Sequence, residues 1–255
     1  MKRRLVFVVM VLFFAANAPV ALAENSKFYG RINFGFYSNY IGGLTGSRAF
    51  NHPVFQQSLA LGLKNPYVDV EGEVWSSVSP RGGFNSDSGD EIDYSINFSR
   101  EFAGFRLGLG YNFFDLYRLG RINGDLHAIC FNVVSPPVFK YLSFYLILEE
   151  DIPTDKEFLD GGFLGKIGAV WSQPIFANCT LNLDGSFGGH DGAYGLRSEP
   201  LSYGRLKTSF VISLWKIWKN NLYLIPEVSF QKDLGHDDGL ACDRIWGGVK
   251  LSVAF

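Results

Sequence analysis

Along most of the chain, apolar and polar residues alternate with a period of two, which is the pattern of a β-strand with one apolar and one polar face. In the last eleven residues, IWGGVKLSVAF, Val249, Leu251 and Val253 share one face, while Lys250 and Ser252 lie on the other. The same alternation, clean in most segments and weaker in the sixth and seventh, predicts twelve strands. They span residues 28–36, 54–63, 68–78, 91–99, 105–114, 125–134, 140–149, 163–172, 179–187, 206–215, 222–231 and 245–255.

The links between these segments alternate in length, which indicates how the strands are arranged. Long or intermediate polar links cover residues 37–53, 79–90, 115–124, 150–162, 188–205 and 232–244, and short ones include 64–67, 101–103 and 135–137. Long outer loops and tight periplasmic turns are typical of a transmembrane antiparallel up-and-down β-barrel, whose strand number is even in bacterial single chains. We therefore expect an all-β barrel of twelve strands, with ten or fourteen as the alternatives, and both termini on the periplasmic side.

Composition supports a membrane barrel over a soluble β-sandwich. Apolar residues make up 47% of the chain and aromatic residues 16%, yet they are dispersed rather than collected into a span. This dispersal is expected when every second strand residue faces lipid. The net charge of −2 argues against nucleic acid as a partner. The expected location is the outer membrane of a Gram-negative bacterium, with outer-membrane lipid as a partner.

The N-terminus has the pattern of a secretory signal peptide. Lys2, Arg3 and Arg4 precede an apolar run over residues 5–16, and Ala21-Leu22-Ala23 matches a small-x-small cleavage site. An uncleaved anchor helix is the alternative, but the apolar run is shorter than the ~18 residues that a span requires. We expect a cleaved segment over residues 1–23 and one barrel domain over residues 24–255.

The polar faces of the predicted strands carry charges that would line the barrel interior. Acidic residues concentrate on the third and fourth strands, while basic residues lie on the first and last strands, which become neighbours when the barrel closes. The predicted lumen-lining residues are Arg31, Asp69, Glu71, Glu73, Glu91, Asp93, Arg106, Lys166, Asp184, Lys207, Glu227 and Lys250. Opposed acidic and basic walls could select small polar or zwitterionic solutes. Alternatively, these charges pair and plug a narrow barrel.

Candidate residues for catalysis or metal binding are few. Cys130, Cys179 and Cys242 fit no zinc spacing. His190-Asp191 and residues 236–238 (His-Asp-Asp) fall in expected outer loops, where an Asp–His pair is chemically conceivable, although solvated loop charge is the simpler interpretation. No Gly-x-Ser-x-Gly elbow, His-Glu-x-x-His motif or phosphate loop is present. We expect no cofactor, no metal and no enzymatic activity; a lipid or peptide hydrolase and a structural or receptor barrel are the alternatives.

Two resemblances extend this interpretation. The C-terminal strand is similar to that of bacterial outer-membrane barrels, which implies that Phe255 acts as an assembly signal read by the barrel-assembly machinery. Ser38-Asn39-Tyr40, Pro53 to Gln56, Val74 to Ser77 and the segment from Asp93 to Tyr111 resemble the TorF-type porins. This resemblance implies an outer-membrane channel for passive diffusion of small hydrophilic solutes. Residues 41–43 (Ile-Gly-Gly) replace the arginine–glycine pair usual in that family, so no role of that arginine carries over.

Overall fold

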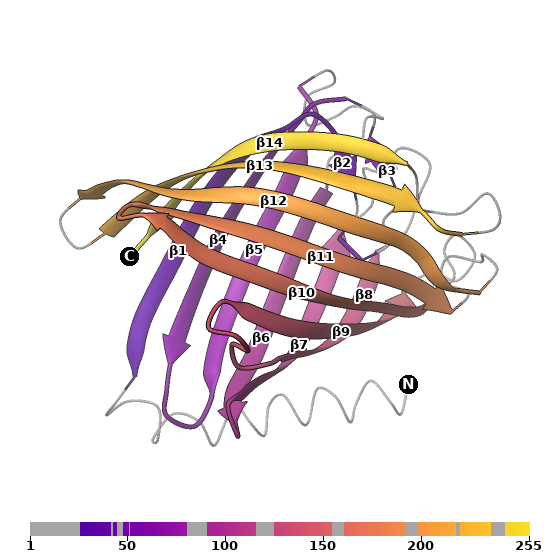
Figure 1. Cartoon of the computed structure of the whole chain (residues 1–255). Helices are drawn as coiled ribbons and strands as arrows, with labels where there is room; N and C mark the ends of the chain where they lie inside the picture. Colours follow the sequence, from indigo (N-terminus) through magenta and orange to yellow (C-terminus); the bar gives the residue numbers. More distant parts are fainter. Residues whose placement is uncertain are drawn as a thin grey trace.

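The protein forms a closed antiparallel barrel of twelve strands in the computed structural model (Figure 1). The structure describes residues 26–41, 43–44, 48–50, 52–80, 91–115, 125–154, 161–191, 198–217, 220–235 and 243–255, without the side chains of 48–50, 216, 217 and 220. Within these ranges, no helix is long and apolar enough to cross a bilayer. The expected all-β barrel with twelve strands is therefore confirmed.

Each barrel strand pairs with its neighbours in chain order, and a short hairpin lies apart from the barrel sheet. The barrel strands are β1 (Lys27–Tyr37), β4 (Val54–Lys64), β5 (Asp69–Val78), β6 (Glu91–Phe102), β7 (Phe105–Asp115), β8 (Leu126–Val134), β9 (Leu142–Pro153), β10 (Gly162–Phe176), β11 (Cys179–Asp191), β12 (Glu199–Ile217), β13 (Asn220–Asp233) and β14 (Arg244–Ala254). The hairpin consists of β2 (Tyr40–Ile41) and β3 (Arg48–Phe50). It lies at the end of the barrel opposite the C-terminus (Figure 1).

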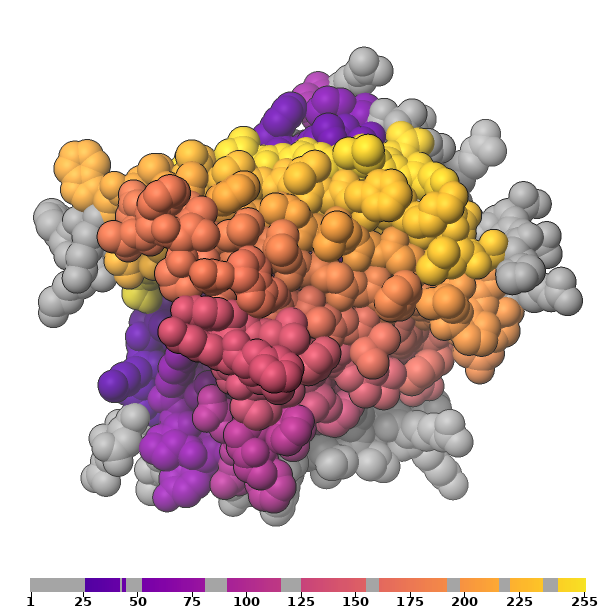
Figure 2. Space-filling view, in the orientation of Figure 1, coloured from indigo at the N-terminus to yellow at the C-terminus, as the bar shows by residue number. Residues whose placement is uncertain are grey.

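The outer surface of the barrel is apolar because one parity of every strand faces outward. Phe34 on β1, Leu61 on β4 and Leu251 on β14 are each more than two-fifths exposed. The side chains of β10 to β14 form a continuous surface on the face seen in Figure 2. On these strands, Ile167 and Leu206 are each more than half exposed. Apolar residues at these positions suit contact with lipid rather than with water.

The barrel closes through β1 and β14, the first and last strands. Ile32 pairs with Val253 and Phe34 with Leu251, which fixes the register of the seam. The Gly30 N–H donates to the Phe255 carbonyl at 2.8 Å, and the Phe255 N–H donates to the Gly30 carbonyl at 3.0 Å. The Phe255 ring occupies the space where a Cβ of residue 30 would lie, so this close approach requires a glycine. The expected pairing of the first and last segments is confirmed.

The strand boundaries differ from expectation mainly at the end of the barrel that carries the long links. There β12 begins at Glu199 rather than at residue 206, β11 continues to Asp191, and β9 continues to Pro153. These extensions contain glycines or adjacent carboxylates, so their alternation is not visible in the sequence. Pro226 lacks a backbone N–H, so a bulge or local distortion is expected in the segment 222–231. The β13–β14 register runs through Pro226↔Val249 without a shift, whereas the β12–β13 pairing passes from Ser209↔Glu227 to Ile212↔Leu224 without a pair at Pro226.

Candidate functional site: the barrel lumen

The cross-strand register determines which side chains share the inner face of the barrel. Arg31 lies beside Ala60, Ala60 beside Glu73, and Glu73 beside Ser95, so these four side chains point to the same side of the sheet. Continuing this parity around the barrel reaches all the charged residues assigned to the polar faces. They are Arg31, Asp69, Glu71, Glu73, Glu91, Asp93, Arg106, Lys166, Asp184, Lys207, Glu227 and Lys250. Their contact with a solute stays a prediction.

Two adjacent cavities lie on this inner face. The larger has a volume of about 420 Å³ and is lined by Arg31 and Lys250 on one side and by Glu73 and Trp75 on the other. The smaller, of about 220 Å³, shares Glu73 and Trp75 with the first and also contacts Asp93. The lining therefore changes from basic to acidic across the two cavities.

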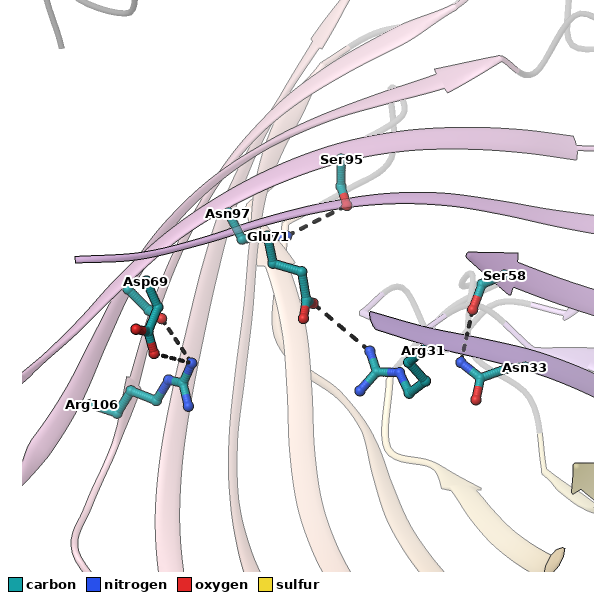
Figure 3. A network of polar contacts seen from close by, with 9 residues as sticks. Arg31, Asn33, Ser58, Asp69, Glu71, Ser95, Asn97 and Arg106 are labelled. Atoms are coloured by element: carbon teal, nitrogen blue, oxygen red, sulfur yellow. Dashed lines mark hydrogen bonds and ion pairs between the residues drawn. The ribbon is translucent and has the colours of Figure 1, made fainter. Parts of the chain in front are cut away.

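Several charged side chains of the lumen form ion pairs that join different strands on the inner face of the barrel. Figure 3 shows Glu71 of β5 pointing toward Arg31 of β1, with 3.8 Å between the guanidinium and the carboxylate. In the same view, Asp69 faces Arg106 at 3.5 Å. Elsewhere Lys207 lies 3.0 Å from the Glu227 carboxylate. Lys166 instead packs over the ring of Tyr145, with Nζ 5.6 Å from its centroid.

A buried acidic wall lies on β6 and β9 near the end with the long links. Glu91 is 5% exposed, and Glu149 and Asp151 are equally well buried. Asn112, from β7 between these strands, donates a hydrogen bond to Glu149 at 3.2 Å. Sequence reasoning missed Glu149 and Asp151 because apolar residues occupy both faces of the segment before them. Within the described ranges, no group of three or more His, Cys, Asp or Glu residues is arranged to hold a metal ion.

A basic and aromatic wall faces the interior from β12, β13 and β14. Arg205, also missed from the sequence, donates through Nε and Nη2 to Gln231 at 3.0 and 2.7 Å. Its guanidinium lies 4.9 Å from the Tyr203 ring centroid and 5.3 Å from that of Trp246. Tyr203 and Gln231 are fully buried. Because cation–π contacts and a side-chain amide hold the guanidinium, its position is fixed.

The first strand of the β2–β3 hairpin and the described part of its turn connect the two walls. We call the described residues Tyr40, Ile41, Gly43 and Leu44 the mouth segment. The Tyr40 hydroxyl donates to Glu91 on the acidic wall at 2.6 Å, and its ring packs 5.7 Å from that of Trp75. On the other wall, the Tyr203 hydroxyl lies 3.0 Å from the Leu44 carbonyl and 3.2 Å from the Gly43 carbonyl, and Arg205 donates to Gly43 at 3.2 Å. The mouth segment therefore spans the lumen between opposite charges.

Three lumen tyrosines lie flat against the wall because each ring covers a glycine on the neighbouring strand. Tyr29 covers Gly62, Tyr145 covers Gly168, and Tyr203 covers Gly188; a Cβ at any of these glycines would overlap the ring. The glycines thus provide room for large side chains without filling the lumen. The Tyr145 hydroxyl also donates to Asp184 at 2.9 Å.

His190 does not lie in an outer loop, where the sequence analysis placed it. His190 belongs to β11 rather than to a loop, and its side chain is 3% exposed, on the inner parity between Leu164 and Glu199. The interpretation of His190 as a solvated charge in an outer loop is therefore wrong. The pairing of β11 with β12 continues through this position, which the glycine-rich sequence did not indicate. Residues 236–238 lie outside the described residues.

Comparisons with known proteins identify the fold. No protein family model matches the chain, and none of the curated proteins matches its sequence. Among solved structures, the chain is similar to the NanC porin, with a TM-score of 0.51 at 10% identity over 89% of this chain and 98% of the porin. It is also similar to an outer-membrane channel from Pseudomonas putida F1, with a TM-score of 0.50 at 10% identity over 93% of this chain and 98% of the channel. The chain thus shares the barrel architecture of these two channel proteins.

Proposed function

We propose that this protein is a bacterial outer-membrane channel through which small hydrophilic solutes diffuse passively. The observation that carries the proposal is the pair of polar cavities inside a closed barrel whose outer surface is apolar. A membrane protein gains nothing from unpaired polar groups in its interior unless water or a solute contacts them. The barrel architecture of the two similar channel proteins agrees with this function.

The proposed pore is narrow, because side chains and the mouth segment fill much of the barrel interior. The mouth segment crosses the lumen, and inner-face side chains such as Ser77, Ala128 and Gln231 are fully buried. Small barrels fill much of their interior with side chains, whereas only wide ones leave a large aqueous channel. We call the larger cavity, of about 420 Å³, the central cavity. It is therefore expected to admit small solutes and to exclude bulky oligomers.

The finer parts of the proposal come from the sequence. They comprise a cleaved signal peptide over residues 1–23, a relationship to the TorF-type porins, insertion by the barrel-assembly machinery with Phe255 as a signal, and a boundary of outer-membrane lipid. A non-enzymatic role is consistent with the burial of His190, one of the two histidines considered for an Asp–His pair. No cofactor is required for diffusion through a polar lumen.

Single-channel recording in planar bilayers tests the function directly. The informative variant is Gln56→Cys, because Gln56 lines the central cavity. Its matched control is Phe55→Cys, the adjacent residue on β4, which faces outward and is 38% exposed. Both are made with Cys130, Cys179 and Cys242 replaced by serine. A charged, water-soluble thiol reagent should reduce the conductance of Gln56→Cys in discrete steps and leave Phe55→Cys unchanged.

A plugged structural barrel is the second candidate, favoured by the buried layer around the mouth segment. Inserted, folded protein that shows no current above the lipid background would reject the channel and support the plugged barrel. Conductance that responds equally to modification of either cysteine would reject the proposed route through the central cavity. Folding of each variant is checked by the heat-dependent shift in electrophoretic mobility that closed barrels show.

A further inference from the structure

We infer that Glu73 and Lys250 select zwitterionic solutes, holding the ammonium end near Glu73 and the carboxylate end near Lys250. This inference rests on the proposed channel function and names the solute class that the central cavity prefers.

Most charges on the inner wall already have partners. Arg31 pairs with Glu71, Arg106 with Asp69, and Lys207 with Glu227. Glu73 and Lys250 differ, because within the described part of the chain neither makes a hydrogen bond or an ion pair. Both are half-buried and both line the central cavity. Because neither charge is held by a hydrogen bond or an ion pair, each can bind a solute group without breaking such a contact in the wall.

The two charges approach the cavity from different sides. Lys250 is on β14 and Glu73 on β5, with β1 and β4 between them. In the pairing, Lys250 lies beside Gly35, Gly35 beside Gln56, and Gln56 beside Ser77. Ser77 is four residues beyond Glu73 along β5, an offset of about 13 Å along the strand. The charges are therefore separated along the cavity, which suits a short peptide better than a compact ion.

The surface between the charges is polar and incompletely hydrogen-bonded. Asn33 donates to Ser58 at 2.9 Å, but its Oδ1 is buried and has no hydrogen-bond partner among the described residues. Trp75 adds an aromatic surface where the two cavities meet. The volume of about 420 Å³ falls within the range of small-molecule sites.

Anionic, cationic and neutral solutes are each expected to interact less favourably with the cavity than a zwitterionic solute does. A purely anionic solute meets Glu73 and the nearby Asp93, whereas a purely cationic one meets Lys250 and Arg31. A neutral solute of the same size leaves both charges without partners. Only a solute with one ammonium and one carboxylate group complements both ends, and discrimination depends on this difference in interaction.

Liposome swelling with matched solutes tests the inference. Triglycine is compared with its N-acetylated, C-amidated analogue, which is of similar size but has no charged ends. Wild-type protein should admit triglycine faster than the capped analogue. The ratio of the two swelling rates, triglycine to capped analogue, measures the preference. Glu73→Gln and Lys250→Gln should each lower this ratio by about two- to five-fold, the effect of one partly exposed charge contact. Exchanging the charges, Glu73→Lys with Lys250→Glu, should restore it.

Two controls separate the site from general charge effects. Glu101→Gln and Lys140→Gln make the same changes in net charge as the test variants, but at exposed residues outside the linings of both cavities. Both should retain the wild-type ratio. As a measurement that needs no variant, triglycine should block the wild-type ion current at lower concentration than the capped analogue does.

The outcomes distinguish this inference from the proposed function. No swelling with either solute, from folded protein, would reject the channel itself. Equal swelling and equal block by both solutes would reject zwitterion selectivity and leave the channel in place. A preference for triglycine that survives both neutralising variants would reject Glu73 and Lys250 as its cause.

Discussion

Replacing Tyr203 with phenylalanine removes one hydroxyl group from the contact that holds the mouth segment. The hydroxyl lies 3.0 Å from the Leu44 carbonyl and 3.2 Å from the Gly43 carbonyl, and its single proton serves these two acceptors. The aromatic ring would stay, covering Gly188 and supporting the Arg205 guanidinium. The substitution therefore weakens one attachment of the mouth segment while the barrel wall keeps its packing.

The size of the effect follows from the removal of a single hydrogen bond. One neutral hydrogen bond contributes about 1 kcal/mol, which corresponds to a ratio of about five at 25 °C. The Arg205 contact with Gly43 and the Tyr40 contact with Glu91 remain, so the mouth segment stays attached in most molecules. If the open channel requires this segment to leave the lumen, the mean closed time should fall about five-fold.

Single-channel recording at fixed voltage measures the closed times. Tyr145→Phe is the matched control, because its ring also covers a glycine while its hydroxyl donates to Asp184 rather than to the mouth segment. Tyr145→Phe should keep wild-type closed times. Unchanged closed times in Tyr203→Phe, with an intact barrel, would refute the idea that the mouth segment limits the current.

The barrel seam and one surface ion pair provide further tests. Gly30→Val should reduce the folded fraction on unheated gels because its side chain meets the Phe255 ring, whereas Gly185→Val, an outward position with open space, should fold normally. At the end with the long links, the Lys232 ammonium and the Asp233 N–H hold the pKa of Asp243 below its ordinary value of 3.8. A carboxyl group whose pKa is lower in the folded than in the unfolded protein stabilises the fold at pH values above its unfolded pKa. This stabilisation is lost as the pH falls through its folded pKa. The protection of the Asp233 amide, its exchange rate relative to the intrinsic rate at the same pH, should therefore fall below about pH 4. Asp243→Asn should remove that pH dependence; an unaltered profile would contradict this assignment.

The strands were predictable because alternation records which side chains face lipid at nearly every position. Residues 54–63, for example, match β4 to within one residue. The mouth segment was not predictable, because its position depends on contacts such as that of Tyr203 with Gly43, which are 160 residues apart in the chain. The hairpin strands β2 and β3 also have only two and three residues, which is too short for an alternating pattern to be visible in the sequence.

The acidic wall shows a different limit of sequence analysis. In β9, apolar residues occupy both parities before Glu149, Glu150 and Asp151, so the pattern does not indicate which carboxylates face inward. Pairing supplies the missing information: Glu149 lies beside Cys130, and Asp151 beside Ala128, both on the inner parity. The side of the sheet that a carboxylate occupies is therefore a property of the closed barrel, and the local sequence does not determine it.

In each tyrosine–glycine pair, the ring on one strand fills the space beside the glycine on the next strand. The size of one residue therefore limits the size of the other. Enlarging Gly62, Gly168 or Gly188 alone displaces a ring, and shortening only the tyrosine leaves a gap in the wall. A mutational path to a lumen of different width must therefore first shorten the tyrosine and only then enlarge the glycine. Homologous barrels with other lumen widths are expected to differ at both members of a pair or at neither, so the pairs should coevolve.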